Sequence, residues 1–331
     1  MLTIMIIRLY PLLVLAMAAS AAHGAINISG FTSINNDRFA NNVNFIANSF
    51  DLSGIAIVDT NQSNFTGDDG GRWIAMISDN VFITAHHFFP ANGASATFYG
   101  SNDPSGLSAT RTIQSSQRIG TSDLRIGTLD TPLGAGFASY DFATEDITNI
   151  NALDPDSLQQ SQYGLKNAYI LGRSETEWAT SQDIAVGRNI IDYWLDSVTV
   201  AGTTDDALAT IVNQVSDGNF VSDEAGLAVG DSGAPMLVED ETGNLTIVGI
   251  NWFIATAGET NINGFSYVGN YDTEIQDFIE ANVVPEPHTY SLLLGISSCL
   301  MLFSRRKRTN RRGHQPKANL SCDPEVNFNC E

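Results

Sequence analysis

Short apolar runs recur along the middle of the chain, separated by clusters of Gly, Asn, Asp and Ser. Runs of this length between turn-forming residues indicate β-strands rather than helices. Several such strands in one chain predict an all-β barrel or sandwich. The runs lie at residues 54–58, 73–77, 81–83, 168–171 and 245–250.

One late segment has a different period. In residues 271–280, Ile275, Phe278 and Ile279 are three and four positions apart, and acidic residues occupy the first turn. This pattern predicts a single amphipathic helix, because acids are favourable near a helix N-terminus. The polar stretch from Asp141 to Gln162 has no clear period, and we expect it to connect two halves of one domain, residues 26–283.

The N-terminal residues 1–25 have the order of a secretory leader. One basic residue, Arg8, precedes the apolar stretch Leu9 to Ala19, and small residues follow up to Ala25. This order predicts a signal peptide that is cleaved near Gly24 or Ala25, and therefore an exported protein.

The C-terminal segment 284–308 also has three parts in order. Val284-Pro285-Glu286-Pro287 comes first, an apolar run from Tyr290 to Phe303 follows, and Arg305-Arg306-Lys307-Arg308 ends the segment. The apolar run is shorter than the roughly 20 residues that a spanning helix needs, and the basic cluster is expected on the cytoplasmic side. An ordinary membrane anchor is one interpretation.

The same order resembles the PEP-CTERM sorting signal. The resemblance implies transient anchoring through 290–303 in the cell envelope, until an exosortase-type enzyme handles the exported protein. The chain departs from that pattern because a further segment, 309–331, follows the basic cluster. No role is assigned to this basic and then acidic tail.

Charge is unevenly distributed along the chain. The whole chain has 16 Lys and Arg against 37 Asp and Glu, but only eight of the basic residues and 33 of the acidic ones lie in 26–284, for a formal charge of −25 there. This charge excludes a nucleic-acid ligand, which needs a basic face. Because Cys299, Cys322 and Cys330 all lie beyond this region, we expect no disulfide in it, although export would permit one.

The candidate chemistry starts at Gly230-Asp231-Ser232-Gly233-Ala234-Pro235. Glycines permit a turn sharp enough to expose the Ser232 hydroxyl. Such a hydroxyl can attack a carbonyl if a base takes its proton and nearby N–H groups bind the oxyanion. The alternative is a surface turn between strands with no chemical role.

A histidine base for Ser232 has only two candidates in the middle of the chain, His86 and His87. Histidine titrates near neutral pH without special tuning. Because adjacent residues on a strand point to opposite sides, and no Cys or third His is available there, we expect no metal site. Asp123, which precedes the alternating apolar residues Leu124 and Ile126, is the candidate carboxylate that orients the histidine.

These pieces together resemble the chymotrypsin/trypsin-like serine peptidase family. The matching segments are Thr84-Ala85-His86-His87-Phe88, the strand that opens with Asp123, and Gly230-Asp231-Ser232-Gly233, in the family's chain order. The resemblance spans about Gly54 to Ala281. It implies two six-stranded antiparallel β-barrels followed by a C-terminal helix, a triad of His87, Asp123 and Ser232, and an oxyanion hole formed by the N–H groups of Gly230 and Ser232. It implies no cofactor.

The same resemblance places the substrate pocket. Gly226 falls at its floor, where trypsin-like members have an acid, and Asn251, Trp252 and Phe253 fall on the strand that lines it. A ring at Phe253, where the family often has glycine, predicts small apolar side chains at the cleavage site.

Activation in the family involves a freed N-terminal amine that pairs with the aspartate before the serine, here Asp231. Ile28-Ser29-Gly30-Phe31 is the candidate for such a terminus.

These features are consistent with three functions. The first is an exported serine endopeptidase that acts on polypeptides. The second is a catalytically inactive peptidase-fold protein of the envelope with a binding or adhesion role. It is suggested by Ala234, by Phe253 and by the lack of a basic cleavage site followed by the Ile-Val-Gly-Gly-type run of the family. A lipase or esterase would need a helix after the serine, whereas Met236-Leu237-Val238 indicates a strand. The acidic loops around Asp59 and Asp68-Asp69 are expected to be solvated turns rather than calcium sites.

Overall fold

The computed structural model describes residues 25–59, 71–148, 161–174 and 182–282. Several predicted features fall outside these ranges. They are the signal peptide up to Gly24, the sorting segment, the tail 309–331, Asp68-Asp69 and most of the expected connection between the two halves. Within them, no helix has the length and apolar character that crossing a membrane requires.

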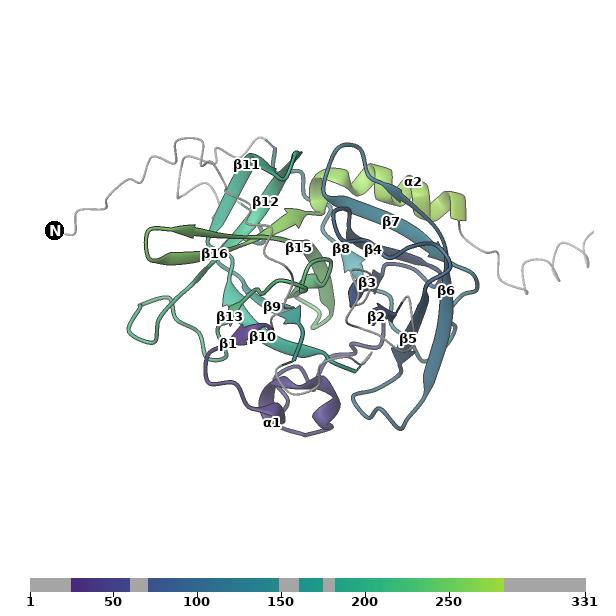
Figure 1. The fold of residues 1–331 in the computed structure, drawn as a ribbon, viewed down its shortest axis with the longest axis horizontal. Coiled ribbons are helices and arrows are strands. Elements are labelled where there is room, and N and C mark those ends of the chain that lie inside the picture. The colour runs from purple at the N-terminus through teal and green to yellow at the C-terminus, as the bar shows by residue number, and fades with distance from the viewer. Residues whose placement is uncertain (1–24, 60–70, 149–160, 175–181, 283–331) are drawn as a thin grey trace, which may run out of the picture. The chain divides into compact units, whose positions relative to one another are not determined.

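The first half of the fold is a closed barrel of six antiparallel strands in the order β2-β3-β4-β7-β6-β5 (Figure 1). Closure leaves no unpaired sheet edge. Strands at 55–59, 72–76 and 81–85 confirm that three of the apolar runs form β-strands, as predicted. The strands are β2 (Ile55–Asp59), β3 (Arg72–Met76), β4 (Val81–Ala85), β5 (Ser95–Tyr99), β6 (Ser108–Arg118) and β7 (Leu124–Leu129).

The second half is an eight-stranded sheet in the order β10-β9-β14-β15-β16-β12-β11, with β8 beside β15. All pairs are antiparallel except that of β8 with β15, so this half has two strands more than the six expected from the family resemblance. The strands are β8 (Asp141–Phe142), β9 (Asn167–Gly172), β10 (Ala185–Ile190), β11 (Tyr193–Val200), β12 (Thr203–Val212), β14 (Pro235–Glu239), β15 (Leu245–Ala257) and β16 (Thr260–Tyr267).

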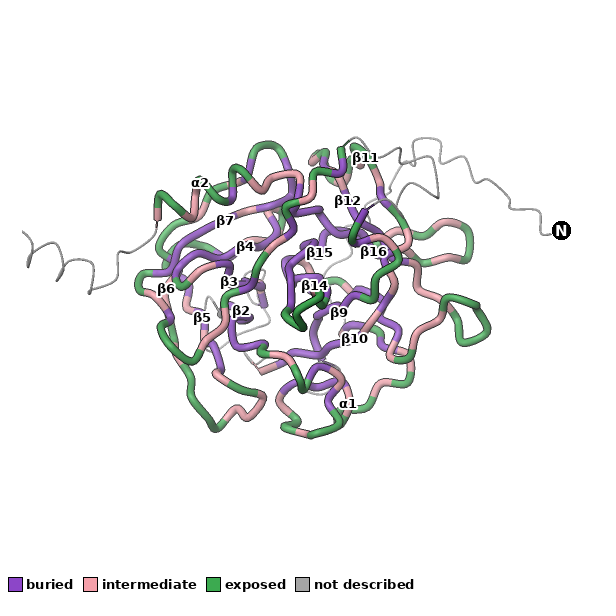
Figure 2. Tube along the Cα trace, turned by 180° about the vertical axis from the view of Figure 1, so that it is seen from behind, coloured by how far each residue is buried: buried purple, intermediate pink, exposed green. Residues whose placement is uncertain are grey.

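The two halves share a hydrophobic core. Every residue of β4 is buried (Figure 2), because the two faces of this strand serve different cores. Phe82 belongs to a cluster inside the first barrel, whereas Ile83 belongs to a cluster that also contains Leu237 and Ile250 of the second half. This shared cluster holds the end of β4 against the start of β14, which is where the candidate site lies.

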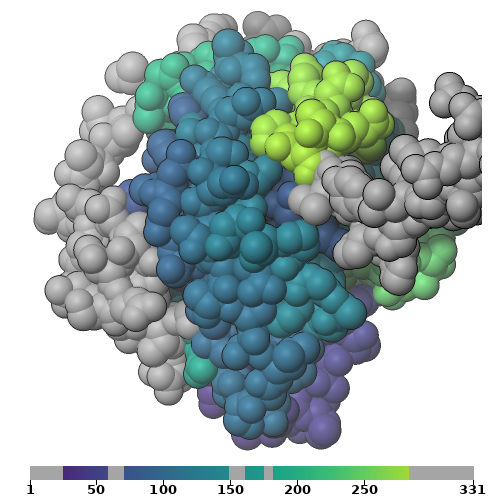
Figure 3. All heavy atoms as spheres, turned by 90° about the vertical axis from the view of Figure 1, so that its right-hand side faces the viewer, coloured from purple at the N-terminus to yellow at the C-terminus, as the bar shows by residue number. Residues whose placement is uncertain are grey.

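The two ends of the described chain pack on this body. The N-terminal β1 (Asn27–Ile28) pairs with β13 (Ala225–Gly226), and α1 (Ser33–Asn36) and η1 (Arg38–Ala40) follow. At the other end, η3 (Gly269–Tyr271) leads into α2 (Asp272–Asn282), which confirms the predicted helix. Ile275 of α2 is fully buried in the shared cluster, and Figure 3 shows the helix lying against the first half. The predicted class, an all-β fold with a C-terminal helix, is confirmed.

Candidate functional site

His87 and Asp123 form a hydrogen-bonded pair at the edge of the first barrel. The Nδ1 atom of His87 lies 2.7 Å from Oδ2 of Asp123, and the backbone N–H of His87 donates to Oδ1 at 3.1 Å. The Asp123 side chain is 0% exposed, whereas that of His87 is 35% exposed. A buried carboxylate on Nδ1 leaves the other ring nitrogen, Nε2, available to act as a base.

The strand register explains why these two residues meet. β4 and β7 are antiparallel partners, with Ala85 opposite Leu124. The residue after β4 and the residue before β7 are therefore neighbours, and the N–H of His86 donates to the backbone carbonyl of Asp123 at 2.6 Å. The next residue, His87, is then within reach of the Asp123 carboxylate.

His86 lies in a different environment. Its Nδ1 atom is 3.3 Å from the Arg125 guanidinium, and its ring is stacked parallel to that of Phe89 at 5.9 Å. Burial lowers the pKa of His86, and the charges of Arg118 and Arg125 lower it further. The two adjacent histidines are thus distinguished by their partners, and His87 is the one that has a carboxylate on its ring.

The turn that carries Ser232 lies against the end of β4. Gly230 and Gly233 have φ angles of 105° and 91°, which only glycine adopts easily. A Cβ atom on Gly233 would lie 2.8 Å from Oγ1 of Thr84 and 3.5 Å from the N atom of Ala85. This close approach places half-buried Ser232 next to the strand end that leads into His87.

Two backbone N–H groups of this turn are free of protein acceptors in the described part of the chain. They belong to Gly230 and Ser232, whereas the N–H groups of Asp231, Gly233 and Ala234 all donate to backbone carbonyls. Two unpaired donors on either side of one residue can bind a developing oxyanion. The sequence prediction for the oxyanion hole named these same two residues.

Among the described residues there is no hydrogen bond between the Ser232 hydroxyl and the His87 ring. Such hydrogen bonds are often long in unliganded enzymes and shorten when substrate binds. The structure therefore brings together His87 and Asp123 directly, and Ser232 through the contact of its turn with β4.

Asp231 anchors the same turn from the interior of the protein. Its side chain is fully buried, Oδ1 accepts the N–H of Arg173 and Oδ2 accepts the N–H of Ala228, both at 2.8 Å. Burial raises the pKa of Asp231 to about 7. If Gly172 carried a Cβ atom, that atom would lie 2.7 Å from the carboxyl carbon of Asp231 and 2.7 Å from Cβ of Ile26. Of the two isoleucines at the start of the described chain, Ile26 rather than Ile28 therefore lies near this carboxyl group.

Asn251 differs from its predicted role in substrate binding. It is 1% exposed, and its side-chain amide donates to the carbonyls of Leu171 and Asp231 at 2.9 and 3.0 Å. Its backbone carbonyl also accepts the N–H of Gly233. Asn251 therefore supports the serine turn from the interior of the protein.

The remaining predicted pocket residues are also buried. Gly226 lies in β13, where an added Cβ would meet Val212 at 3.3 Å. Trp252 and Phe253 are 5% and 9% exposed, and their rings pack edge to face at 5.2 Å. The ring of Phe253 covers the α-carbon of Gly264 so closely that a side chain at Gly264 could not fit.

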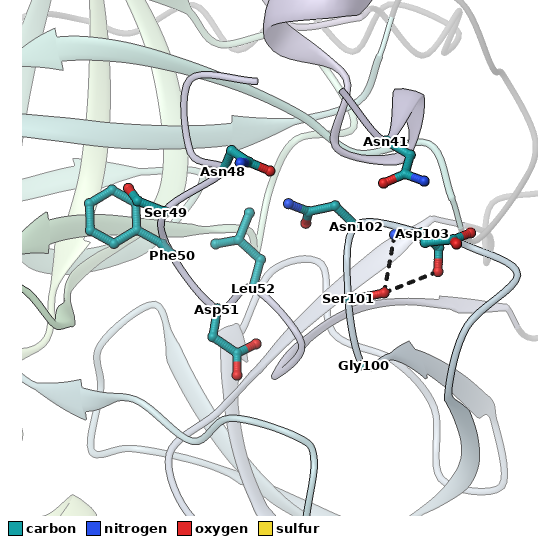
Figure 4. Close-up of a pocket in the computed structure, with 10 residues that line it drawn as sticks. All are labelled: Asn41, Asn48, Ser49, Phe50, Asp51, Leu52, Gly100, Ser101, Asn102 and Asp103. Carbon is teal, nitrogen blue, oxygen red and sulfur yellow. Dashed lines mark hydrogen bonds between the residues drawn. The ribbon is translucent and has the colours of Figure 1, made fainter. Parts of the chain in front are cut away.

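A separate hollow of about 420 Å³ opens on the first half of the fold (Figure 4). It contains no triad residue, and Asn and Asp side chains dominate its wall. Its lining residues are Asn41, Asn48, Ser49, Phe50, Asp51, Leu52, Gly100, Ser101, Asn102 and Asp103. In the described ranges no three metal-ligating side chains gather at one point.

Sequence reasoning missed one residue of this site, Asp205. Its carboxylate accepts the backbone N–H of Asp123 at 2.8 Å. No motif contains it, but one signal was present. Strand alternation in 203–212 puts Asp205 on the same face as Ala207 and Ala209, and an acid on a buried face needs partners.

Comparison with known proteins shows a limited likeness. A solved structure of a mutant of human heparin binding protein (CAP37) is similar, with a TM-score of 0.47 and 15% identity, over 71% of this chain and 95% of that one. No family model matches the chain, and no curated protein matches it. The fold assignment rests on the strand topology of the chain itself.

Proposed function

We propose that this chain is an exported serine endopeptidase. The observation that carries the proposal is the 2.7 Å contact between Nδ1 of His87 and the buried carboxylate of Asp123, at the strand end against which the Ser232 turn packs. A surface turn without chemical role needs no such pair. The free N–H groups of Gly230 and Ser232 support the same proposal.

In the proposed reaction, Oγ of Ser232 attacks the carbonyl carbon of a peptide bond while Nε2 of His87 takes the hydroxyl proton. Asp123 stabilises the imidazolium that forms. The carbonyl oxygen becomes an oxyanion and accepts hydrogen bonds from Gly230 and Ser232. His87 then gives the proton to the departing amine, which leaves an acyl-enzyme. Water, activated by His87, attacks this ester and releases the acid product and Ser232.

The proposed substrates are polypeptides with a small side chain before the cleaved bond. This preference rests on Phe253, which lies on β15, the strand that by resemblance to chymotrypsin-like peptidases would line the pocket, and whose ring covers Gly264 of β16. An uncharged floor at Gly226, close to Val212, supports an apolar rather than a basic side chain.

The decisive experiment compares the wild type with Ser232→Ala. We expect the wild type to hydrolyse casein and to be labelled by a fluorophosphonate probe, and the variant to lose both while its thermal unfolding is unchanged. Labelling of Ser232→Ala at the wild-type rate would refute the assignment of the nucleophile. A wild type that folds but neither reacts nor cleaves would favour the inactive binding protein.

We also propose export and sorting through the two ends of the chain. Replacing Pro285-Glu286-Pro287 by Ala-Ala-Ala is expected to change the location of the protein among cell fractions, because an exosortase-type enzyme would no longer act on 284–308. The matched control replaces three residues in the tail 309–331. An unchanged distribution in the first variant would leave an ordinary membrane anchor as the better interpretation.

We propose that the exported chain is trimmed at Ile26. The N atom of Ile26 donates to the carbonyl of Arg173 at 2.9 Å, and the backbone N–H of Arg173 donates to the Asp231 carboxylate, so a freed amine would lie one residue from that carboxylate. The earlier candidate, Ile28, is instead paired with Ala225 in a strand. N-terminal sequencing of active protein tests this proposal. Full activity of a chain that begins at Ala25 would contradict it.

A further inference from the structure

Asp205 is a buried carboxylate behind the His87–Asp123 pair. It lies in β12, in the second half of the fold, and is 3% exposed. Burial raises the pKa of Asp205 above its usual value, and the hydrogen bonds that it accepts offset part of this increase. A buried carboxylate is costly unless its oxygens are hydrogen-bonded, so the partners of Asp205 show what holds it in place.

Both oxygens of Asp205 accept two hydrogen bonds each. Oδ2 accepts the backbone N–H of Asp123 at 2.8 Å and the hydroxyl of Ser266. Oδ1 accepts the hydroxyl of Tyr271 at 2.6 Å and the N–H of Asp206 at 2.9 Å. The donors come from the β6–β7 loop, from β16, from η3 and from β12 itself, so one side chain connects four segments.

The bond to Asp123 continues directly into the candidate site. Asp123 is held at its N–H by Asp205, at its backbone carbonyl by His86 and at both carboxylate oxygens by His87. Asp123 therefore links β12 of the second half to His87 of the first half, through a hydrogen bond at its backbone N–H and hydrogen bonds at its carboxylate.

We propose that Asp205 is a positioning residue for His87, which acts by fixing the backbone of Asp123. This inference rests on the proposed peptidase function. Asp205 does not reach the reacting atoms. Its role is to hold the Asp123 carboxylate at the place where it meets Nδ1, which keeps the ring oriented and its tautomer correct.

The test compares three variants that affect different bonds. Asp205→Ala removes the acceptor of the Asp123 N–H. Asp205→Asn keeps one oxygen, which can still accept that N–H. Its amide group donates to the hydroxyl of Tyr271, and only the N–H of Asp206 loses its acceptor. Tyr271→Phe removes a donor to Oδ1, which is not the oxygen that accepts the Asp123 N–H, and is the matched control for loss of a hydrogen bond to Asp205.

We expect Asp205→Ala to lower kcat by about tenfold to a hundredfold, which is the range that small misplacements of catalytic groups cause. KM should stay within about twofold of the wild-type value, because Asp205 does not contact the substrate. Asp205→Asn and Tyr271→Phe should keep kcat within about threefold, because both retain the bond to Asp123. A wild-type kcat in Asp205→Ala, or an equal loss in Tyr271→Phe, would overturn the proposal.

A second measurement does not depend on activity. The proton between Nδ1 of His87 and Asp123 should give a downfield proton NMR resonance in the wild type and in Asp205→Asn, and a broadened or lost one in folded Asp205→Ala. An unchanged resonance in Asp205→Ala refutes positioning even if the wild type proves inactive. If the alanine variant does not fold, Asp205→Val replaces it, because valine fills the space in a strand without accepting a hydrogen bond.

Discussion

At the scale of single residues, the environment of each side chain decides the chemistry that the sequence leaves open. His86 and His87 are adjacent, yet one contacts Arg125 and the other a buried carboxylate. A cation beside an imidazole disfavours its protonated form, whereas a carboxylate favours it. In the proposed mechanism, His87 is therefore the histidine that takes the proton of Ser232.

Asp123→Asn tests this difference. The amide keeps the size of the side chain but can present its NH2 group to Nδ1 of His87, which selects the wrong tautomer and blocks Nε2 as a base. We expect kcat/KM for peptide hydrolysis at neutral pH to fall by about a thousandfold to ten-thousandfold. Circular dichroism should show an unchanged fold. A fall of less than tenfold would remove Asp123 from the triad.

Phe253→Ala tests the second residue-scale claim, that a ring limits the side chain before the cleaved bond. Its removal should raise kcat/KM for Leu or Phe substrates relative to Ala substrates by about tenfold or more, as expected when a pocket gains room for several methylenes. The neighbouring Ile254 is 41% exposed, and Ile254→Ala serves as the control that should not change the ratio. An unchanged ratio in Phe253→Ala would place the specificity pocket elsewhere.

At the scale of elements, the sequence predicts what depends on local pattern and misses what depends on register. The runs at 73–77 and 81–83 and the spacing of Ile275, Phe278 and Ile279 predict β3, β4 and α2, because burial of one face imposes a period. Pairing of Ala85 with Leu124 is a tertiary choice with no local signal. The support of the serine turn by Asn251 and the hydrogen bond from the Asp123 N–H to Asp205 follow from such pairings. Strand alternation could show that Asp205 is buried, but not which group it accepts from.

Gly233→Ala tests the contact between the serine turn and β4. Both Gly233 and Gly243 have positive φ angles, 91° and 86°, so alanine at either position should lose about 1–2 kcal/mol of unfolding free energy from backbone strain. Only at Gly233 would the new Cβ also press on Thr84, at 2.8 Å, which adds about 1–3 kcal/mol of overpacking.

Urea unfolding of the two variants measures this difference, and Gly243→Ala is the matched control. Gly233→Ala should also lose activity, because Ser232 must move away from His87, whereas Gly243→Ala should keep it. Equal losses of stability with full activity in both variants would show that the turn does not depend on close packing against β4.

At the scale of the whole molecule, the site lies on the contact between the two halves, and charges buried there influence stability. Asp231, next to Ser232, and Asp183, which pairs with Arg173 at 3.1 Å, are both fully buried side chains. Burial raises the pKa of Asp231 to about 7 and that of Asp183 to about 6. Asp231, which anchors the serine turn, is therefore also a residue whose ionisation opposes folding.

These two groups contribute to the pH dependence of unfolding, together with Asp192, whose pKa burial also raises to about 6. An unfolded aspartate has a pKa of about 3.9, so between about pH 4 and pH 7 the folded protein binds more protons than the unfolded chain. The contribution of each group to stability is thus fully present below about pH 4 and is lost as the pH rises through the folded pKa. The Asn side chain of Asp231→Asn cannot ionise. The unfolding free energy of this variant, measured in urea from pH 4.5 to pH 8, should fall less steeply than that of the wild type, and Asp183 and Asp192 supply part of the remaining slope. Asp240→Asn, at an exposed turn where hydrogen bonds from Thr242 and Asn244 lower the pKa of Asp240, should keep the wild-type slope over this range. If Asp231→Asn and the wild type had the same slope, Asp231 would be ionised in the folded protein throughout, and its charge would be balanced by the surrounding N–H groups and Arg173.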